Sequence, residues 1–161
     1  MKKILSLTMA LAMLGTALTG CGSKDAATKT PAENTQQEQS QTEKALALIN
    51  TFATGDTDTA RSLLSDGYIQ HNLAYGTGAD AFIGSVEYLA SADVKTTVNN
   101  IRAFEDGDKV FLQTIYNFAG AGEQVAFDIF RFDEDGKIAE HWDVMETIAD
   151  QSTWQNQNGK F

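Results

Sequence analysis

The chain has 161 residues, a length that fits one domain with a single hydrophobic core. It carries 12 lysines and arginines against 22 aspartates and glutamates, for a formal net charge of −10. Such a surface repels phosphate backbones, which argues against nucleic acid as a partner. The only cysteine, Cys21, leaves no partner for an internal disulfide, so packing alone must hold the fold together.

The first residues have the layout of a secretory signal peptide. Lys2 and Lys3 form a positive start, residues 4–18 are uncharged and mostly apolar, and small residues precede Cys21. The apolar run is too short for a bilayer span, which needs about 20 residues. We therefore expect a cleaved signal rather than a retained membrane helix.

The ending Leu18-Thr19-Gly20-Cys21 resembles a lipobox. The resemblance implies that residues 1–20 are removed and that the Cys21 thiol carries a lipid such as palmitate. This lipid would anchor the protein to a membrane of the cell envelope, with the domain facing outside the cytoplasm. The alternative is a secreted protein in which this cysteine is incidental. Residues 21–42 lack branched aliphatic and aromatic side chains and predict a disordered tether. Residues 43–161 remain as the globular domain.

Three helices are expected in the first half of this domain. Apolar residues at helical spacing over residues 45–53 predict the first, with Thr42 as its N-cap and Gly55 as its stop. The same pattern predicts a second helix over residues 56–65 and a third over residues 80–91.

Strand-forming residues dominate from Val94 onward, after a brief expected strand at residues 68–70. Asp106-Gly107 is a hairpin signal, and a second hairpin is expected around residues 133–136. The expected long strands cover residues 96–105, 109–118, 125–132 and 137–148. Helices followed by an antiparallel meander predict an α+β fold, in which three N-terminal helices pack on a strongly bent antiparallel sheet.

The last hairpin predicts a polar cluster. If residues 133–136 form its loop, Asp128 lies opposite His141, and opposed residues project from the same face. Asp143 shares that face with His141 because the side-chain period of a strand is two. The even-numbered residues of this last strand, such as Trp142, point away from it. An imidazole beside carboxylates could move protons. The alternative is a salt-bridged face in water, and a one-residue change of register would scatter the cluster.

Two blocks stand near the start and the end of the domain: YIQHN at residues 68–72, and the hairpin sequences FDIFRF at 127–132 and GKIAEHWDV at 136–144. Together they resemble the SnoaL-like, polyketide-cyclase-like branch of the nuclear transport factor 2-like (NTF2-like) superfamily. The resemblance implies an NTF2-like, cystatin-like cone with a pocket at its wide end, a small-molecule ligand, and a homodimer formed through the sheet.

The resemblance further implies a lyase or isomerase that needs no cofactor and no metal and acts on a small carbonyl compound. Asp143 would be the proton-handling carboxylate, His141 and Trp142 would flank the pocket, and His71 would reach it after the second helix. The expected catalytic residues are His71, Asp128, His141 and Asp143; the expected ligand-binding residues are Tyr68, Tyr116, Phe118 and Trp142.

Two alternatives stay open. A metal held by the two histidines and an aspartate is chemically feasible but has no local spacing signature. The same pocket could also belong to a non-catalytic module that binds a small ligand or a peptide at the cell envelope, because a fold does not establish catalysis.

Overall fold

A computed structural model describes residues 39–161, so the predictions about the signal peptide, Cys21 and most of the tether lie outside the described residues. The helices are α1 (Gln41–Thr54), α2 (Thr57–Leu63) and α3 (Ala79–Ser91), and the strands are β1 (Leu64–Gln70), β2 (Thr97–Asp106), β3 (Lys109–Asn117), β4 (Gln124–Phe132) and β5 (Ile138–Thr147), with short 3-10 turns η1 (Phe118–Gly120) and η2 (Gln151–Thr153). None of the helices within residues 39–161 has the length and apolar character needed to cross a membrane.

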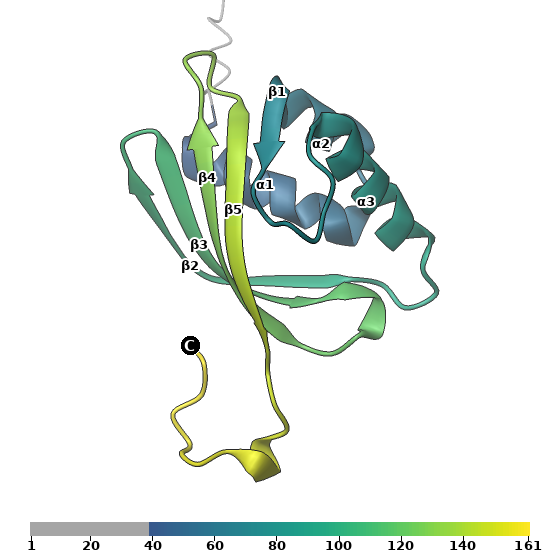
Figure 1. The fold of residues 1–161 in the computed structure, drawn as a ribbon, viewed down its shortest axis with the longest axis vertical. Helices are drawn as coiled ribbons and strands as arrows, with labels where there is room; N and C mark the ends of the chain where they lie inside the picture. Colours follow the sequence, from purple (N-terminus) through teal and green to yellow (C-terminus); the bar gives the residue numbers. More distant parts are fainter. Residues whose placement is uncertain (1–38) are drawn as a thin grey trace, which may run out of the picture. The chain divides into compact units, whose positions relative to one another are not determined.

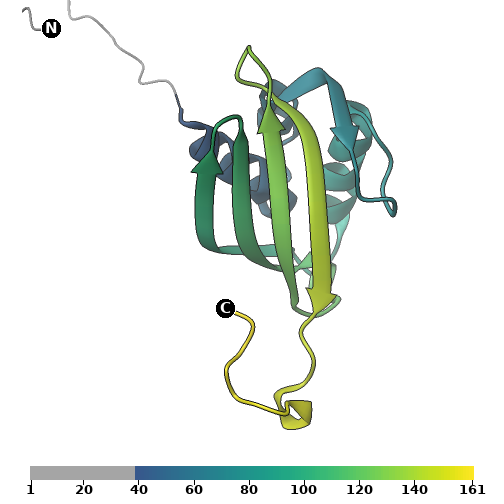
Figure 2. The ribbon, with the colours of Figure 1, turned by 60° about the vertical axis from the view of Figure 1, so that its left-hand side comes forward.

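The strands form one bent sheet in the order β1-β5-β4-β3-β2, and all three helices cover its concave face (Figures 1 and 2). Strands β2 to β5 form the expected antiparallel meander. Strand β1 pairs with β5 in parallel, so the sheet is mixed rather than wholly antiparallel. A parallel neighbour needs a long connection, and here α3 and three strands lie between β1 and β5 in the chain.

Helix α1 starts two residues earlier than expected. The Ser40 side chain accepts a hydrogen bond from the Glu43 backbone N–H, and the Glu43 carboxylate accepts one from the Ser40 N–H, which makes a capping box. Thr42, the expected N-cap, instead donates its hydroxyl to Glu105 of β2 at 2.8 Å. The stop at Gly55 is confirmed: this residue has a φ of 74°, which glycine adopts without steric cost.

The second helix is shorter than expected, and the strand after it is longer. Helix α2 ends at Leu63, and Leu64 already belongs to β1. Leu64 and Tyr68 are both buried. Leu64 lies opposite Ile138 of β5, so pairing with this strand decides the extended conformation here against local helix propensity.

The hydrophobic core fills the space between the helices and the concave face of the sheet. Its largest fully buried side chains include Leu48 and Ile49 from α1, Val86 from α3, and Leu112 and Phe130 from the sheet. Two ionisable side chains, Asp128 and His141, are buried on the same face of the sheet. Burial of such groups is costly unless hydrogen bonds satisfy them, which directs attention to their surroundings.

Candidate active site

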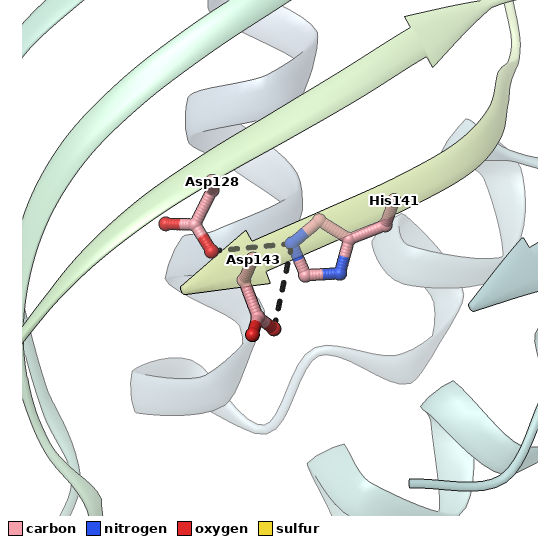
Figure 3. A group of neighbouring side chains, drawn as sticks. All are labelled: Asp128, His141 and Asp143. Atoms are coloured by element: carbon pink, nitrogen blue, oxygen red, sulfur yellow. Dashed lines mark hydrogen bonds and ion pairs between the residues drawn. The ribbon is translucent and has the colours of Figure 1, made fainter. Parts of the chain in front are cut away.

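Neighbouring strands bring two carboxylates and an imidazole together. Asp128 of β4 lies opposite Asp143 of β5, and His141 precedes Asp143 by two residues on the same face. The His141 Nε2 atom is 3.1 Å from Asp128 Oδ1 and 4.0 Å from Asp143 Oδ2 (Figure 3). All three side chains are less than a tenth exposed, at 5% for Asp128, 8% for His141 and 6% for Asp143.

The strand register differs from the expected one by two positions. Asp128 pairs with Asp143 rather than with His141. Residues 133–137 close the hairpin, with the Asp133 N–H donating to the Lys137 carbonyl, which adds one position. Ala139 forms a bulge that adds another. Because the total shift is even, the three side chains keep a common face.

The segment after β1 orients the imidazole. The Gln70 backbone lies beside His141 in the parallel ladder, and the Gln70 amide nitrogen is 3.0 Å from His141 Nδ1. The Gln70 side-chain oxygen, Oε1, accepts a hydrogen bond from the Asn72 backbone N–H at 2.9 Å. This bond fixes the side-chain amide so that its NH₂ group faces the imidazole ring. His141 Nδ1 is therefore an acceptor, and the ring proton sits on Nε2, where it points at Asp128.

The two carboxylates have different environments. Each Asp128 oxygen has a hydrogen-bond partner, because His141 reaches one and the Tyr116 hydroxyl donates to the other at 2.9 Å. Asp143 accepts the Asn72 side-chain amide on Oδ1 at 2.6 Å, while its Oδ2 has only the more distant His141 beside it. Burial raises the pKa of Asp143 above its usual value of 3.8 and outweighs the opposing effects of His141 and of the Asn72 hydrogen bond, while the charge of Asp128 adds a smaller increase. Asp143 therefore combines an open oxygen with increased basicity.

Two tyrosines supply neutral hydroxyl groups. Burial raises the pKa of Tyr68 far above its usual value of 10.0, and the charges of Asp143 and Asp128 add to the effect. Burial likewise raises the pKa of Tyr116, together with the charge of Asp128 and the hydrogen bond to it. Both phenols stay protonated: Tyr116 donates to Asp128, and Tyr68 accepts from the Gln70 amide at 3.4 Å and keeps its own proton to donate.

The cluster faces a cavity of about 770 Å³, a volume typical of small-molecule sites. Asp128, His141 and Asp143 all line it. Of the four expected ligand-binding residues, Tyr68, Tyr116 and Phe118 also line the cavity, and Trp142 is not among the lining residues.

Trp142 and His71 belong to the opposite face. Their rings stack with centroids 4.4 Å apart, and His71 Nε2 lies 2.8 Å from a carboxylate oxygen of Glu140, which also pairs with Arg131. The hydrogen bonds from His71 and Arg131 hold the pKa of Glu140 below its usual value. The expected approach of His71 and Trp142 to the pocket is therefore wrong, because strand alternation turns both side chains outward. Simple alternation along the last strand predicts that Ile138 points away from the core, as Trp142 does. The bulge reverses this alternation, and Ile138 is fully buried in the core.

Gln70 and Asn72 are site residues that sequence reasoning missed. They contact His141 and Asp143 directly, yet neither carries a titratable group that draws attention. A signal existed in the alternation of β1: Tyr68, Gln70 and Asn72 share a parity, and His71 has the opposite one. The side-chain period of two therefore predicts that the amides of Gln70 and Asn72 lie on the cavity face with Tyr68, and that His71 lies on the other face.

Asp128, His141 and Asp143 could also offer three ligand atoms to a metal ion, since these atoms lie within 4.8 Å of one another. A metal-bound histidine normally donates its other ring N–H to an acceptor. Here the atom facing Nδ1 is the donor NH₂ group of Gln70. The site as built therefore favours a proton, rather than a metal, on Nε2.

Comparison with known proteins places this fold and sequence in a recognised group. The model of the SnoaL-like domain family matches residues 45–141, and no curated protein matches the chain. An NTF2-like protein of unknown function from Cytophaga hutchinsonii superposes with a TM-score of 0.59 and 16% identity, covering 69% of this chain and 94% of its own.

Two further solved structures are named as enzymes. IdmH from Streptomyces antibioticus, a proposed polyketide cyclase, has a TM-score of 0.54 and 18% identity over 67% of this chain and 93% of its own. An LEH-like epoxide hydrolase from M. tuberculosis has a TM-score of 0.58 and 18% identity over 66% and 82%. At these identities the likeness shows a shared NTF2-like cone fold.

The raised pKa of Asp143 predicts a pH-dependent gain in stability for Asp143→Asn. A carboxyl group with a folded-state pKa above 3.8 binds its proton more tightly in the folded chain, so its ionisation costs stability as the pH rises through that window. We expect the free energy of unfolding of the variant, relative to wild type, to increase from about pH 4 to pH 7.

Urea unfolding followed by circular dichroism measures this difference. The exposed substitution Asp66→Asn accounts for the general effect of removing one negative charge from an acidic chain. A gap between Asp143→Asn and wild type that stays constant, or shrinks, with rising pH would contradict the prediction.

Proposed function

The chain belongs to the SnoaL-like domain family, and we propose that it is a cofactor-free acid–base enzyme, a lyase or isomerase, acting on a small carbonyl compound. One observation carries the proposal: the sheltered carboxylate of Asp143 has a raised pKa and an oxygen open to the cavity, where the phenol of Tyr68 stays protonated. A carboxylate of increased basicity beside a protonated phenol supplies a proton acceptor and a hydrogen-bond donor in one cavity.

In this proposal Asp143 Oδ2 removes a proton from the carbon next to the substrate carbonyl. The electron pair of the broken C–H bond moves onto the carbonyl oxygen, and the Tyr68 hydroxyl donates a hydrogen bond to the enolate that forms. Protonated Asp143 then returns the proton at another carbon, or to a leaving group. A solved protein of this fold is named as a proposed polyketide cyclase, and that name is consistent with such chemistry.

His141 serves as a positioning residue rather than as the base. Both of its ring nitrogens are occupied, Nδ1 by Gln70 and Nε2 by Asp128. Its Nε2–H lies between the two carboxylates and can stabilise the charge on Asp143 as the proton leaves or returns. Asn72 holds the other Asp143 oxygen and so aims Oδ2 at the cavity.

Replacement of Asp143 by asparagine tests the catalytic role. Wild-type protein in D₂O should exchange the α-protons of a cyclic ketone from a screened panel, as followed by proton NMR. General-base catalysis contributes roughly 10²–10⁴-fold, so Asp143→Asn should slow the exchange at least about 100-fold while ketone binding persists.

The matched control is Asp66→Asn, which removes an exposed carboxylate outside the cavity and should leave the exchange rate unchanged. Equal rates for wild type and Asp143→Asn would remove the enzyme from consideration. The same cavity would then be that of a binding module, whose ligand affinity can be measured on the same panel.

We also propose a homodimer formed through the outer face of the sheet. Large apolar side chains are exposed there: Phe104 is 64% exposed, Phe127 55% and Val144 73%. Phe104 pairs across strands with Phe111, and Phe127 pairs with Val144, so these side chains are neighbours on one face. Exposed apolar surface of this kind commonly marks a protein interface.

The substitution Phe127→Arg should shift the protein from dimer to monomer in analytical ultracentrifugation, because it places a charge at the centre of this surface. Leu73→Arg is the matched control, since Leu73 is 99% exposed in the loop after β1, away from the sheet. A wild-type protein that is monomeric at high concentration, or a Phe127→Arg variant that still dimerises, would refute the interface.

We further propose that the Cys21 thiol is lipidated after removal of residues 1–20, so that the domain is anchored in the cell envelope by a lipid. The support is the sequence ending Leu18-Thr19-Gly20-Cys21 after a positive start and an apolar run. A mature chain with a lipid and a polar tether would hold the cavity outside the cytoplasm.

Expression of the full chain in a bacterium fed an alkyne analogue of palmitate tests this anchor. Wild type should carry the label and sediment with membranes, and Cys21→Ser should lose both properties. The neighbouring substitution Ser23→Ala should change neither. A Cys21→Ser variant that still sediments with membranes would show that the cysteine is not the anchor.

A further inference from the structure

The charge of the cavity wall restricts what can enter it. Two carboxylates, Asp128 and Asp143, line the cavity, and within residues 39–161 no lysine or arginine is among the lining residues. The imidazole of His141 also lines it, but its Nδ1 accepts from Gln70 and its Nε2–H points at Asp128, so it presents no free cation to a ligand. Anions are normally held by charge-assisted bonds from arginine or lysine, or by helix N-termini. This cavity instead opposes an anion with like charges in a sheltered, low-dielectric space, where such repulsion is strong.

The neutral donors near the carboxylates are already committed. The Tyr116 hydroxyl donates to Asp128, the Asn72 amide donates to Asp143, and the Gln70 amide donates to His141. Beside the carboxylates the Tyr68 hydroxyl remains, since it accepts from the Gln70 amide at 3.4 Å and keeps its own O–H to donate. The further donors of the wall, on Tyr75, Tyr88 and Gln124, are uncharged as well. Uncharged donors suit a carbonyl oxygen better than a carboxylate or a phosphate, which charge-assisted donors normally hold.

Five aromatic rings in mutual contact form a continuous part of the wall. Tyr68 meets Phe82 edge to face with centroids 6.0 Å apart, Phe82 meets Phe52 at 4.9 Å, and Phe52 meets Phe118 at 5.8 Å. Phe118 stacks on Tyr116 at 4.9 Å, which leads back to Asp128. All five rings line the cavity. Such a wall favours flat, apolar, ring-bearing molecules through burial and ring contacts.

From the charge, the committed donors and the aromatic wall, we infer that the cavity takes an uncharged, ring-bearing carbonyl compound and rejects molecules that carry a carboxylate, phosphate or sulfonate. The carbonyl group of this ligand class rests on the proposed function, whereas the selection against anions rests on the cavity wall alone.

Two fluorescent probes that differ by one sulfonate test the inference. N-phenyl-1-naphthylamine is uncharged, and 8-anilino-1-naphthalenesulfonate is the same ring system with a negative charge. We expect wild-type protein to bind the uncharged probe in the cavity at least about tenfold more tightly than the sulfonate at neutral pH. Asp143→Asn should narrow this difference at least roughly threefold, because it removes one of the two opposing charges.

A blocking variant separates the cavity from the exposed outer face of the sheet, which could also bind these probes. Gly84 lies at the cavity wall on α3, and a Cβ atom there would meet no atom within 4 Å, so Gly84→Trp can fill the mouth without a backbone clash. Glu87→Trp is the matched control on the same helix, outside the lining. Gly84→Trp should weaken binding of the uncharged probe at least about tenfold, and Glu87→Trp should not.

Binding of the sulfonate as tight as that of the uncharged probe would overturn the inference, as would binding of the uncharged probe that Gly84→Trp leaves unchanged. These outcomes are independent of turnover. A protein that shows the probe preference but no exchange of ketone α-protons would retain the cavity selectivity and lose only the proposed enzyme. A protein that exchanges those protons but binds the sulfonate equally would retain the enzyme and lose the selectivity.

Discussion

The structure depends on keeping two carboxylates and an imidazole in a sheltered apolar hollow that no lysine or arginine of residues 39–161 lines. Each of these groups has a neutral partner that reduces the cost of burial: Tyr116 for Asp128, Asn72 for Asp143 and Gln70 for His141. Because the partners are neutral, the negative charge is oriented but not cancelled. The basicity of Asp143 and the exclusion of anions both follow from this one arrangement.

Alternation along the strands allowed the centre of the site to be predicted from the sequence. The expected pairing of the last hairpin was wrong by two positions, since neither the closing pair at residues 133 and 137 nor the bulge at Ala139 has a local signature. Each error alone would have moved Asp128 away from His141 and Asp143, and together they preserved the parity. The correct cluster therefore came partly from two compensating shifts. The prediction of the α+β order of helices and strands depended only on composition and periodicity, so it did not require a correct strand register.

Long-range contacts were beyond the reach of the sequence. Nothing local indicates that β1 runs parallel beside β5, yet this pairing supplies Gln70 and Asn72 to the site and turns His71 towards Glu140. Chemical reactivity favoured the histidine as a site residue, whereas geometry selected the amides on either side of it. The early end of α2 was missed for a related reason, because packing against the sheet outweighed local preference. The cap at Ser40 is different, since Ser40 followed three residues later by Glu43 is a local capping-box signal present in the sequence.

The parallel strand also determines when the site can exist during folding. Gln70 and Asn72 contact residues 71 positions further along the chain, so the positioning bonds join the beginning of the domain to its last strand. Contacts of such sequence separation require closure of a large loop. His141 and Asp143 lie in β5 itself, so a nascent chain that ends before β5 lacks both these residues and the bonds that position them. The site is therefore complete only when the last strand has joined the sheet.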